Sequence, residues 1–579
     1  MTQDGASAMA AGLPAGVPTA DGSVTAEADA QLEALIRSRF DALMETWPSH
    51  ATALGIHRHD GRLADLSRAA READMAAEAA FISRLEATSV EGLSEPQRFE
   101  RDVALHGARL RLFEAEMVAG WRRGASASRD VGDALFLLMA RDFAPLEDRL
   151  ESITQRLEGV PTALAQARDR LVSRPVRLWN ELELGAAGDL PRLVHEIVLA
   201  ARQRWPAGDA RLARLERAAR ATREALLDYG AWIGTTLDDA SADFALGREA
   251  FDTLIGLRDF DGLTTDDILA IGHEQLEAMH EARREAGRAI DPSLSESEVV
   301  ERVKTDGPPD FEAALTGYRQ SIVRARQFVE AHDLATLPVD DAIEVMPTPL
   351  FMRSLIPLAA YFEPAAFDRP IRGVYIVTPS VDGDPRAMRE HNWASIVNTS
   401  VHEAYPGHHH QFSAALSSPT PARLLTNAPE FHEGWAMYCE EMMLEEGFED
   451  GPARRVIVAT DAIWRACRII LDIGLHRGQI GIDDAIDFLV EHTRFERPVA
   501  RAEVYRYTQT PSYNLSYLLG KVQLLRLRAD ERARLGGGFS LKGFHDALLY
   551  SGNLPVSFQR RLLAGGGGGP TLPEAGIQR

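Results

Sequence analysis

The chain has 579 residues and carries 86 acidic against 63 basic side chains, a formal net charge of −23. This excess of negative charge argues against nucleic acid or an anionic membrane surface as a partner, because both would repel the protein. No basic segment followed by an apolar run opens the sequence, and no later segment approaches the roughly 18 uninterrupted apolar residues of a membrane span. We therefore expect a soluble cytoplasmic protein, in which the two cysteines, Cys439 and Cys467, are too few for a disulfide framework.

The composition of both ends of the chain differs from that of its centre. Residues 1–28 are rich in Ala, Gly and small polar side chains, and residues 564–579 include five consecutive glycines. We expect both segments to be disordered tails. Length alone favours about three to four domains, but no long linker interrupts residues 29–563. We predict a single helical catalytic domain there, which could divide into two lobes of residues 29–340 and 341–563.

Helical patterns dominate the chain from its start. Apolar residues recur at helical spacing over residues 32–47, 146–157, 190–229 and 311–332, with charged residues on the other face. Residues 388–402 and 429–447 continue the series, and Pro429 and Gly447 fit the first turn and the end of a helix. The predicted fold class is therefore mainly α.

Strand patterns cluster in one region, over residues 342–346 and 371–378, where Ile, Val and Tyr occur between Pro and Gly residues. These residues predict a small β-sheet. An exposed edge of it could pair with an extended peptide through backbone hydrogen bonds. Tyr375 would then face the substrate, although an ordinary strand tyrosine anchored by its hydroxyl fits the pattern equally well.

Residues 401–411 read VHEAYPGHHHQ and carry the most specific chemistry in the sequence. Zinc hydrolases hold the metal with neutral imidazoles and place a carboxylate beside it to accept a proton from water. His402 and Glu403 supply one imidazole and that base. In an HExxH motif the second histidine follows after four residues, but here that position is Pro406 and the next histidine is His408.

Helix geometry decides whether His408 can join His402. Six residues turn an α-helix by about 600°, which places the two side chains on opposite faces. Pro406 has no N–H to donate and Gly407 tolerates unusual dihedral angles, so we expect the helix to break there. After such a break His408 can turn back to His402. His409 needs the same break and remains the competing second ligand.

A third ligand is predicted on the helix of residues 429–447. Glu433 and Glu440 lie on one face of it, so Glu433 could bind the metal while Glu440 orients a histidine. The helix holds six glutamates from residue 430 to residue 446, and most of them must face water. Asn398 precedes His402 by four residues and could hydrogen-bond within the site or to backbone.

The segments HEAYPGHHHQ and EGWAMYCEE resemble the bacterial domain-of-unknown-function 885 family, which is grouped with the Glu-zincin peptidases. Further stretches that resemble the family lie within residues 47–63, 360–375, 472–476 and 506–517, so the likeness covers nearly the whole chain. It implies a large helical zinc-peptidase body with a small sheet beside the active-site cleft. It also implies a Zn²⁺ cofactor, His402 as a ligand, Glu403 as the base and Glu433 as the third ligand. The family commonly reads PGQALSY where this chain reads PSYNLSY at residues 511–517, so the glutamine is missing here.

Amide hydrolysis also needs a donor for the negative oxygen that develops on the carbonyl. His476, Tyr513 and Tyr517 are the candidates late in the chain. We favour Tyr517, because the LSY piece of the late motif is kept, together with His476, which Asp472 could hold. Three arginines could bind a substrate carboxylate: Arg506 first, with Arg353 and Arg372 as competitors.

The sequence thus predicts a zinc-dependent hydrolase that cleaves peptide bonds, with short peptides as substrates and Glu403 as the general base. Three alternatives stay open. They are a helical binding or scaffold protein with a structural or vestigial metal site, a protein without metal, and an amidase that acts on a non-peptide amide. The end from which a peptide would be trimmed and the oligomeric state do not follow from the sequence.

Overall fold

A computed structural model describes residues 20–339, 341–349, 353, 356, 358–379, 388–417 and 419–565. These residues are mainly helical, as predicted, and among them no helix has the length and apolar character needed to cross a membrane. Helix α1 (Ala20–Thr46) begins inside the segment expected to be a tail, so residues 20–28 are helical instead. The remainder of that predicted tail, and nearly all of the C-terminal one, lie outside the described residues.

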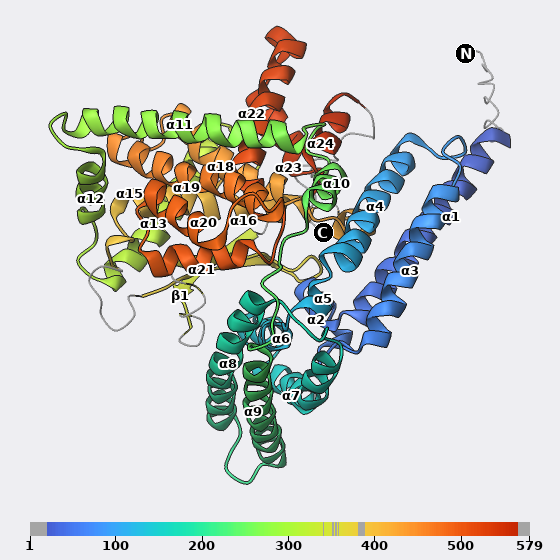
Figure 1. The fold of residues 1–579 in the computed structure, drawn as a ribbon. Helices are drawn as coiled ribbons and strands as arrows, with labels where there is room; N and C mark the ends of the chain where they lie inside the picture. Colours follow the sequence, from blue (N-terminus) through green and yellow to red (C-terminus); the bar gives the residue numbers. More distant parts are fainter. Residues whose placement is uncertain are drawn as a thin grey trace, which may run out of the picture.

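The first eleven helical segments of the described residues form an N-terminal lobe of two groups (Figure 1). Helices α1, α3 and α4 lie side by side, while α6 to α9 form a bundle that projects from the rest of the molecule. The bounds are α1 (Ala20–Thr46), α2 (Pro48–Ala53), η1 (His57–His59), α3 (Arg68–Ala87), α4 (Glu95–Phe113), the π-helix η2 (Glu114–Val118), α5 (Gly120–Arg123), α6 (Ala127–Ala140), α7 (Leu146–Asp169), α8 (Arg177–Arg204) and α9 (Ala210–Thr236).

The remaining helices form the C-terminal body, with the three-stranded sheet at one side of it. The bounds are α10 (Arg248–Arg258), α11 (Thr265–Ile290), α12 (Glu296–Thr305), α13 (Phe311–Ala331), α15 (Trp393–Glu403), α16 (His408–Ala415), α17 (Pro421–Leu424), α18 (Pro429–Glu445), α19 (Pro452–His476), α20 (Ile482–Thr493), α21 (Arg497–Tyr507), α22 (Ser516–Leu535), η5 (Gly536–Gly538), α23 (Leu541–Leu549) and α24 (Val556–Leu563).

The sequence allowed a division into two lobes at residue 340, and that division stays a prediction. Helix α11 packs along α19, and Phe251, Ile268 and Ile463 belong to one hydrophobic core. Helices α10 to α13 are therefore part of the C-terminal body. Hydrophobic cores also join the N-terminal helices to later elements, because Leu554 shares a core with Phe99 and Ile376 shares one with Leu135.

The predicted helices agree well with the observed ones. The apolar patterns over residues 32–47, 146–157 and 311–332 lie within or beside α1, α7 and α13, and the pattern over residues 190–229 is divided between α8 and α9. The helix expected over residues 388–402 is shorter, because Asn392 caps α15 by accepting a hydrogen bond from the Ser395 amide.

The sheet consists of β1 (Asp341–Pro347), β2 (Ala359–Phe362) and β3 (Ile371–Val377). The order is β1-β3-β2, with β1 parallel and β2 antiparallel to the central β3. Strands β1 and β3 were predicted. Strand β2 was not, because its four residues are too few to show an alternating pattern.

Tyr375 does not face a substrate, which corrects the role suggested for it. It lies in the central strand β3 with its side chain fully buried, and its ring packs edge-on against Tyr318 at 5.6 Å. The reason is topological. Helix α13 and the sheet share one hydrophobic core, so this face of β3 points into the protein.

Two glycines let the backbones of α18 and α22 touch. A Cβ added to Gly434 would lie 2.5 Å from the carbonyl carbon of Gly520, and one added to Gly520 would lie 1.9 Å from the Glu430 carbonyl oxygen. No other residue type fits at either position without moving a helix. The contact fixes α18, which carries the predicted ligand Glu433, against α22.

We expect Gly434→Ala to lower the free energy of unfolding by about 1–3 kcal/mol, because the added methyl group overpacks this contact. Urea unfolding monitored by circular dichroism measures the change. Gly188→Ala is the matched control, since a Cβ at that helical glycine would meet nothing within 4 Å and should stabilise the helix slightly. Equal effects of the two substitutions would show that the helices can separate freely.

His57 links the N-terminal lobe to the segment between β2 and β3. Its Nδ1 lies 2.8 Å from Asp60 and its Nε2 lies 2.9 Å from Asp368, while its ring stacks on Phe143. Partial burial opposes the charged imidazole, but the two carboxylates outweigh it and raise the pKa of His57 to about 9.

This raised pKa predicts how the stability contributed by His57 depends on pH. The folded state binds the proton more tightly than the unfolded state, so the contribution is complete below the ordinary histidine pKa of about 6.5 and is lost as pH rises through 9. The difference in unfolding free energy between the wild type and His57→Gln should therefore shrink between pH 7 and pH 10. The exposed His195, changed to Gln, should show no such trend.

Candidate metal centre

The helix breaks after Glu403, as the sequence predicted. Ala404 leaves helical geometry with a ψ of −87°, the Tyr405-Pro406 peptide bond is cis, and α16 begins at His408. A Cβ on Gly407 would lie 1.8 Å from the His402 carbonyl oxygen, so only glycine fits there. The Trp435 indole on α18 donates to the Pro406 carbonyl oxygen at 2.8 Å and holds the break in place.

The break brings His402 and His408 together with Glu433 of α18. One potential ligand atom from each residue lies within 4.8 Å of the other two. The two imidazole rings are perpendicular with centroids 4.8 Å apart, and His408 Nε2 lies 3.3 Å from a Glu433 carboxylate oxygen. Ligands about 2.0–2.1 Å from a tetrahedral zinc ion lie roughly 3.3 Å from one another, so small side-chain shifts would complete the set.

His408, not His409, is the second histidine of this group. His409 is fully buried and points to the sheet, where its Nδ1 lies 2.8 Å from the Tyr361 hydroxyl and its Nε2 3.4 Å from Asp341. Gly373 makes room for this pair, since a Cβ there would lie 2.4 Å from the Tyr361 hydroxyl. His409 therefore anchors α16 to the sheet.

Glu440 and Asn398 lie where the sequence placed them. His402 Nδ1 lies 2.7 Å from Glu440 Oε1, and the Asn398 side-chain amide donates to the other Glu440 oxygen at 3.0 Å and to Asp461 at 3.2 Å. Burial disfavours a charged carboxylate, yet the hydrogen bond from His402 outweighs it and lowers the pKa of Glu440. A charged Glu440 fixes the His402 tautomer and leaves Nε2 free for a metal ion.

Glu433 is held by Tyr513, although the sequence analysis favoured Tyr517. The Tyr513 hydroxyl donates to Glu433 Oε1 at 2.8 Å, and the Tyr517 hydroxyl donates to the Tyr513 hydroxyl oxygen at 3.4 Å. Despite the opposing effect of burial, His408 lowers the pKa of Glu433 strongly. The pair of tyrosines therefore reaches the candidate ligands, with Tyr513 in direct contact.

Glu403 ends α15 directly after His402 and remains partly exposed. Its carboxylate is close enough to oppose ionisation of Tyr361 and Tyr375, although burial is the larger cause of their raised pKa values. Glu403 thus stands directly after His402, where the sequence puts the general base, and that role stays a prediction.

Two further predicted residues, His476 and Arg506, have other partners in the structure. His476 is buried in the core behind α10, where its ring stacks on Phe251 and its Nε2 is 3.1 Å from the Tyr507 carbonyl oxygen; burial lowers its pKa to about 4. Asp472 lies 3.6 Å from it, as expected for that turn of α19. Arg506 is exposed and paired with Glu503 at 2.7 Å. The contacts of His476 are structural, which corrects the catalytic role predicted for it. The charge of Arg506 also acts on Tyr517, so its substrate-binding role stays a prediction.

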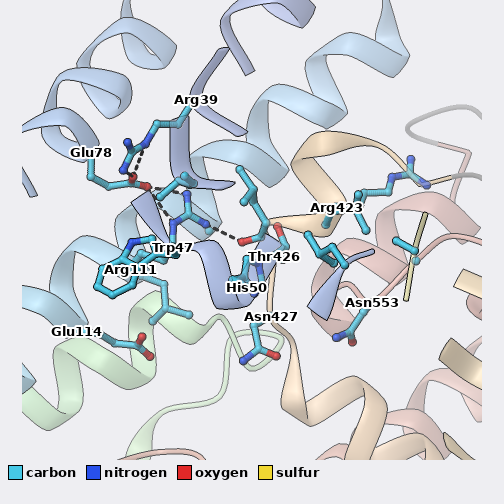
Figure 2. A pocket seen from close by; sticks show the side chains of 18 of the residues that line it. Arg39, Trp47, His50, Glu78, Arg111, Glu114, Arg423, Thr426, Asn427 and Asn553 are labelled. Carbon is cyan, nitrogen blue, oxygen red and sulfur yellow. Dashed lines mark hydrogen bonds and ion pairs between the residues drawn. The ribbon is translucent and has the colours of Figure 1, made fainter. Parts of the chain in front are cut away.

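A cavity of about 750 Å³ is lined in part by neighbours of His408, and Figure 2 shows some of its other lining residues. Its wall includes Phe412 and His432, whose rings lie 5.9 Å and 6.1 Å from that of His408. Sequence reasoning missed both residues. His432 directly precedes Glu433, which was a usable signal, whereas the position of Phe412 depends on the helix break.

A family model described as "Bacterial protein of unknown function (DUF885)" matches residues 48–563. The chain belongs to this family. The DUF885 fold is shared with a solved structure described as "a putative lipoprotein of unknown function" from Shewanella oneidensis, with 21% identity, a TM-score of 0.75, and 92% of this chain and 99% of that chain covered. A "putative lipoprotein" from Colwellia psychrerythraea is similar at 18% identity with a TM-score of 0.80, covering 93% and 99% of the two chains. No curated protein matches the sequence.

We expect Glu440→Gln to weaken zinc binding by about 10- to 100-fold, because the neutral amide holds the His402 tautomer less firmly. Competition with a fluorescent zinc chelator measures the affinity. The control is Glu446→Gln at the exposed end of the same helix, which should bind zinc as the wild type does. Unchanged affinity in Glu440→Gln would remove the ligand role of His402.

Proposed function

We propose that this DUF885 protein is a zinc-dependent hydrolase that cleaves peptide bonds in short peptides, in the manner of the Glu-zincin peptidases. The observation that carries the proposal is the convergence of His402, His408 and Glu433 on one point, with their ligand atoms within 4.8 Å. Two imidazoles and one carboxylate form a ligand set that catalytic zinc sites use, with a position left for water. His402 Nδ1 is already occupied by Glu440, which fits the same role.

The zinc ion and the protein would have different roles in the reaction. When bound, Zn²⁺ would acidify water and polarise the substrate carbonyl. Glu403 accepts a proton from the attacking water and later delivers it to the leaving amine. The Tyr517 hydroxyl, which donates to Tyr513 at 3.4 Å, would turn to donate to the carbonyl oxygen as negative charge develops on it. Glu440, with Asn398 behind it, keeps the His402 ring in one orientation.

The remaining expectations from the sequence stay predictions. They are a cytoplasmic location, and neither nucleic acid nor membrane as a partner. The two structural relatives are each described as a "putative lipoprotein", and fractionation of cells that express the protein would test the location directly.

We predict that Glu403→Gln keeps one zinc per chain but loses nearly all turnover, a decrease on the order of 100-fold or more, because the proton acceptor is lost. Elemental analysis after dialysis measures the metal, and a mixed-peptide digest read by mass spectrometry measures hydrolysis. Glu446→Gln again serves as the control. An active Glu403→Gln protein would contradict the assigned base.

The same digest tests the function as a whole. A wild-type protein that holds zinc yet cleaves no peptide would contradict the proposal and favour a binding or scaffold protein with a structural metal site. A dialysed protein with far less than one zinc per chain would remove the metal centre itself.

A further inference from the structure

The cavity beside the metal centre lies between the two lobes (Figure 2). Helices α1, α3 and α4 with the π-helix η2 supply one part of its wall, and α16, the loop around Asn427 and the loop around Asn553 supply another. Its volume of about 750 Å³ lies in the range that small ligands occupy. A few residues at one end of a peptide fit such a space, whereas a folded protein does not.

The arginines that line the cavity are already paired with protein groups. Their partners are Glu78 and Asp74 for Arg39, Asp74 for Arg71, Glu78 for Arg111, Glu430 for Arg258, and Glu100 for Arg423. Arg111 also donates to the Leu425 carbonyl oxygen. A substrate carboxylate that entered the cavity would therefore have to displace an existing ion pair.

Two carboxylates in the wall, those of Glu114 and Glu363, differ from these paired arginines. The side chains of Glu114 and Glu363 are exposed to the cavity, and across the described part of the chain neither carboxylate has a hydrogen bond or an ion pair. Burial by the surrounding protein raises the pKa of both groups, even though arginines lie nearby. Each therefore lacks a cationic partner in direct contact.

Glu363 lies close to the candidate metal centre, because the ring of Tyr361, two residues before it, is 6.5 Å from that of His408. It follows β2, and His408 and Arg141 both act on its charge. The Arg141 guanidinium donates to the backbone oxygen of Glu363 and to that of Ala53, so it does not hold the carboxylate. Glu114 lies near Arg71, Arg111 and Arg258, whose positive charges would repel a cation.

We propose that this cavity receives the amino-terminal end of a peptide and that the Glu363 carboxylate binds its free α-ammonium group. The inference rests on the proposed function and deepens it: the enzyme would release a short piece from the amino end of its substrate. A charge-assisted hydrogen bond to an otherwise unpaired carboxylate gives the strongest available recognition of that group. Among the described residues that line the cavity, every arginine is already paired, so the carboxyl end of a peptide would bind less well and the orientation of the substrate is set.

Binding of blocked and unblocked peptides tests the inference without requiring hydrolysis. The probe is a library of tetrapeptide amides in which every member is present with a free amino terminus and as its N-acetylated twin. Zinc-loaded Glu403→Gln protein, as the full chain, is mixed with the library, and the retained peptides are read by mass spectrometry. We expect free members to be retained about tenfold more than their twins.

Substitution of the carboxylate should abolish this preference. In Glu363→Gln combined with Glu403→Gln, free and acetylated members should be retained equally, with the acetylated ones bound as before. Glu116→Gln is the matched control, because this residue lies on the same π-helix as Glu114 but does not line the cavity. It should keep the full preference.

Several results would overturn the inference. They are equal retention of the two sets by the unsubstituted cavity, retention of neither set, and retention that follows Lys or Arg side chains rather than the free terminus. An equal loss of both sets in Glu363→Gln would show a merely structural role. Failure of the proposed function would be seen separately, as a wild-type protein that retains free peptides but does not cleave them.

Discussion

The carbonyl oxygen of His402 and the Cα of Gly407 are so close that no side chain can stand between them. The candidate metal centre depends on this contact. It lets the chain turn sharply between α15 and α16, so that two histidines six residues apart face one another instead of opposite sides of a helix. Trp435 holds the turn from α18, the same helix that brings in Glu433.

Charge balance explains why the buried groups around this turn are so well connected. An ionised carboxylate away from water is costly unless it is paired or hydrogen-bonded. Glu440 satisfies this condition through His402 and Asn398, and Glu433 does so through Tyr513 and His408. The polar groups thus form two short chains that meet at the histidines, and each of them limits the rotation of one ligand.

The sequence predicts the centre of the site well and its surroundings poorly. His402, His408, Glu433, Glu440 and Asn398 could be found because each depends on helical periodicity or on one local break. His476 and Tyr375 looked equally functional in the sequence, but their environments are set by helices and strands from elsewhere in the chain. Burial of His476 against Phe251 and of Tyr375 against Tyr318 follows from packing that no local pattern encodes.

The same reason explains the errors in the fold. The helices themselves were predictable from apolar spacing, whereas the sequence did not show which helices share a core. Strand β2 was too short to recognise, and the cavity wall combines segments that lie hundreds of residues apart, such as Glu114 and His432. The sequence shows local structure but not which distant segments lie together, and this limits what can be predicted from it.

The glycine contact between α18 and α22 has a mechanical consequence. With no side chains between the two backbones, neither helix can slide or rotate past the other without a clash. Glu433 near the start of one helix and Tyr517 near the start of the other therefore behave as parts of a single rigid block. Thermal motion that loosens the periphery would leave the spacing between the carboxylate and the phenol pair unchanged, so the geometry of that wall is tuned by backbone shape alone.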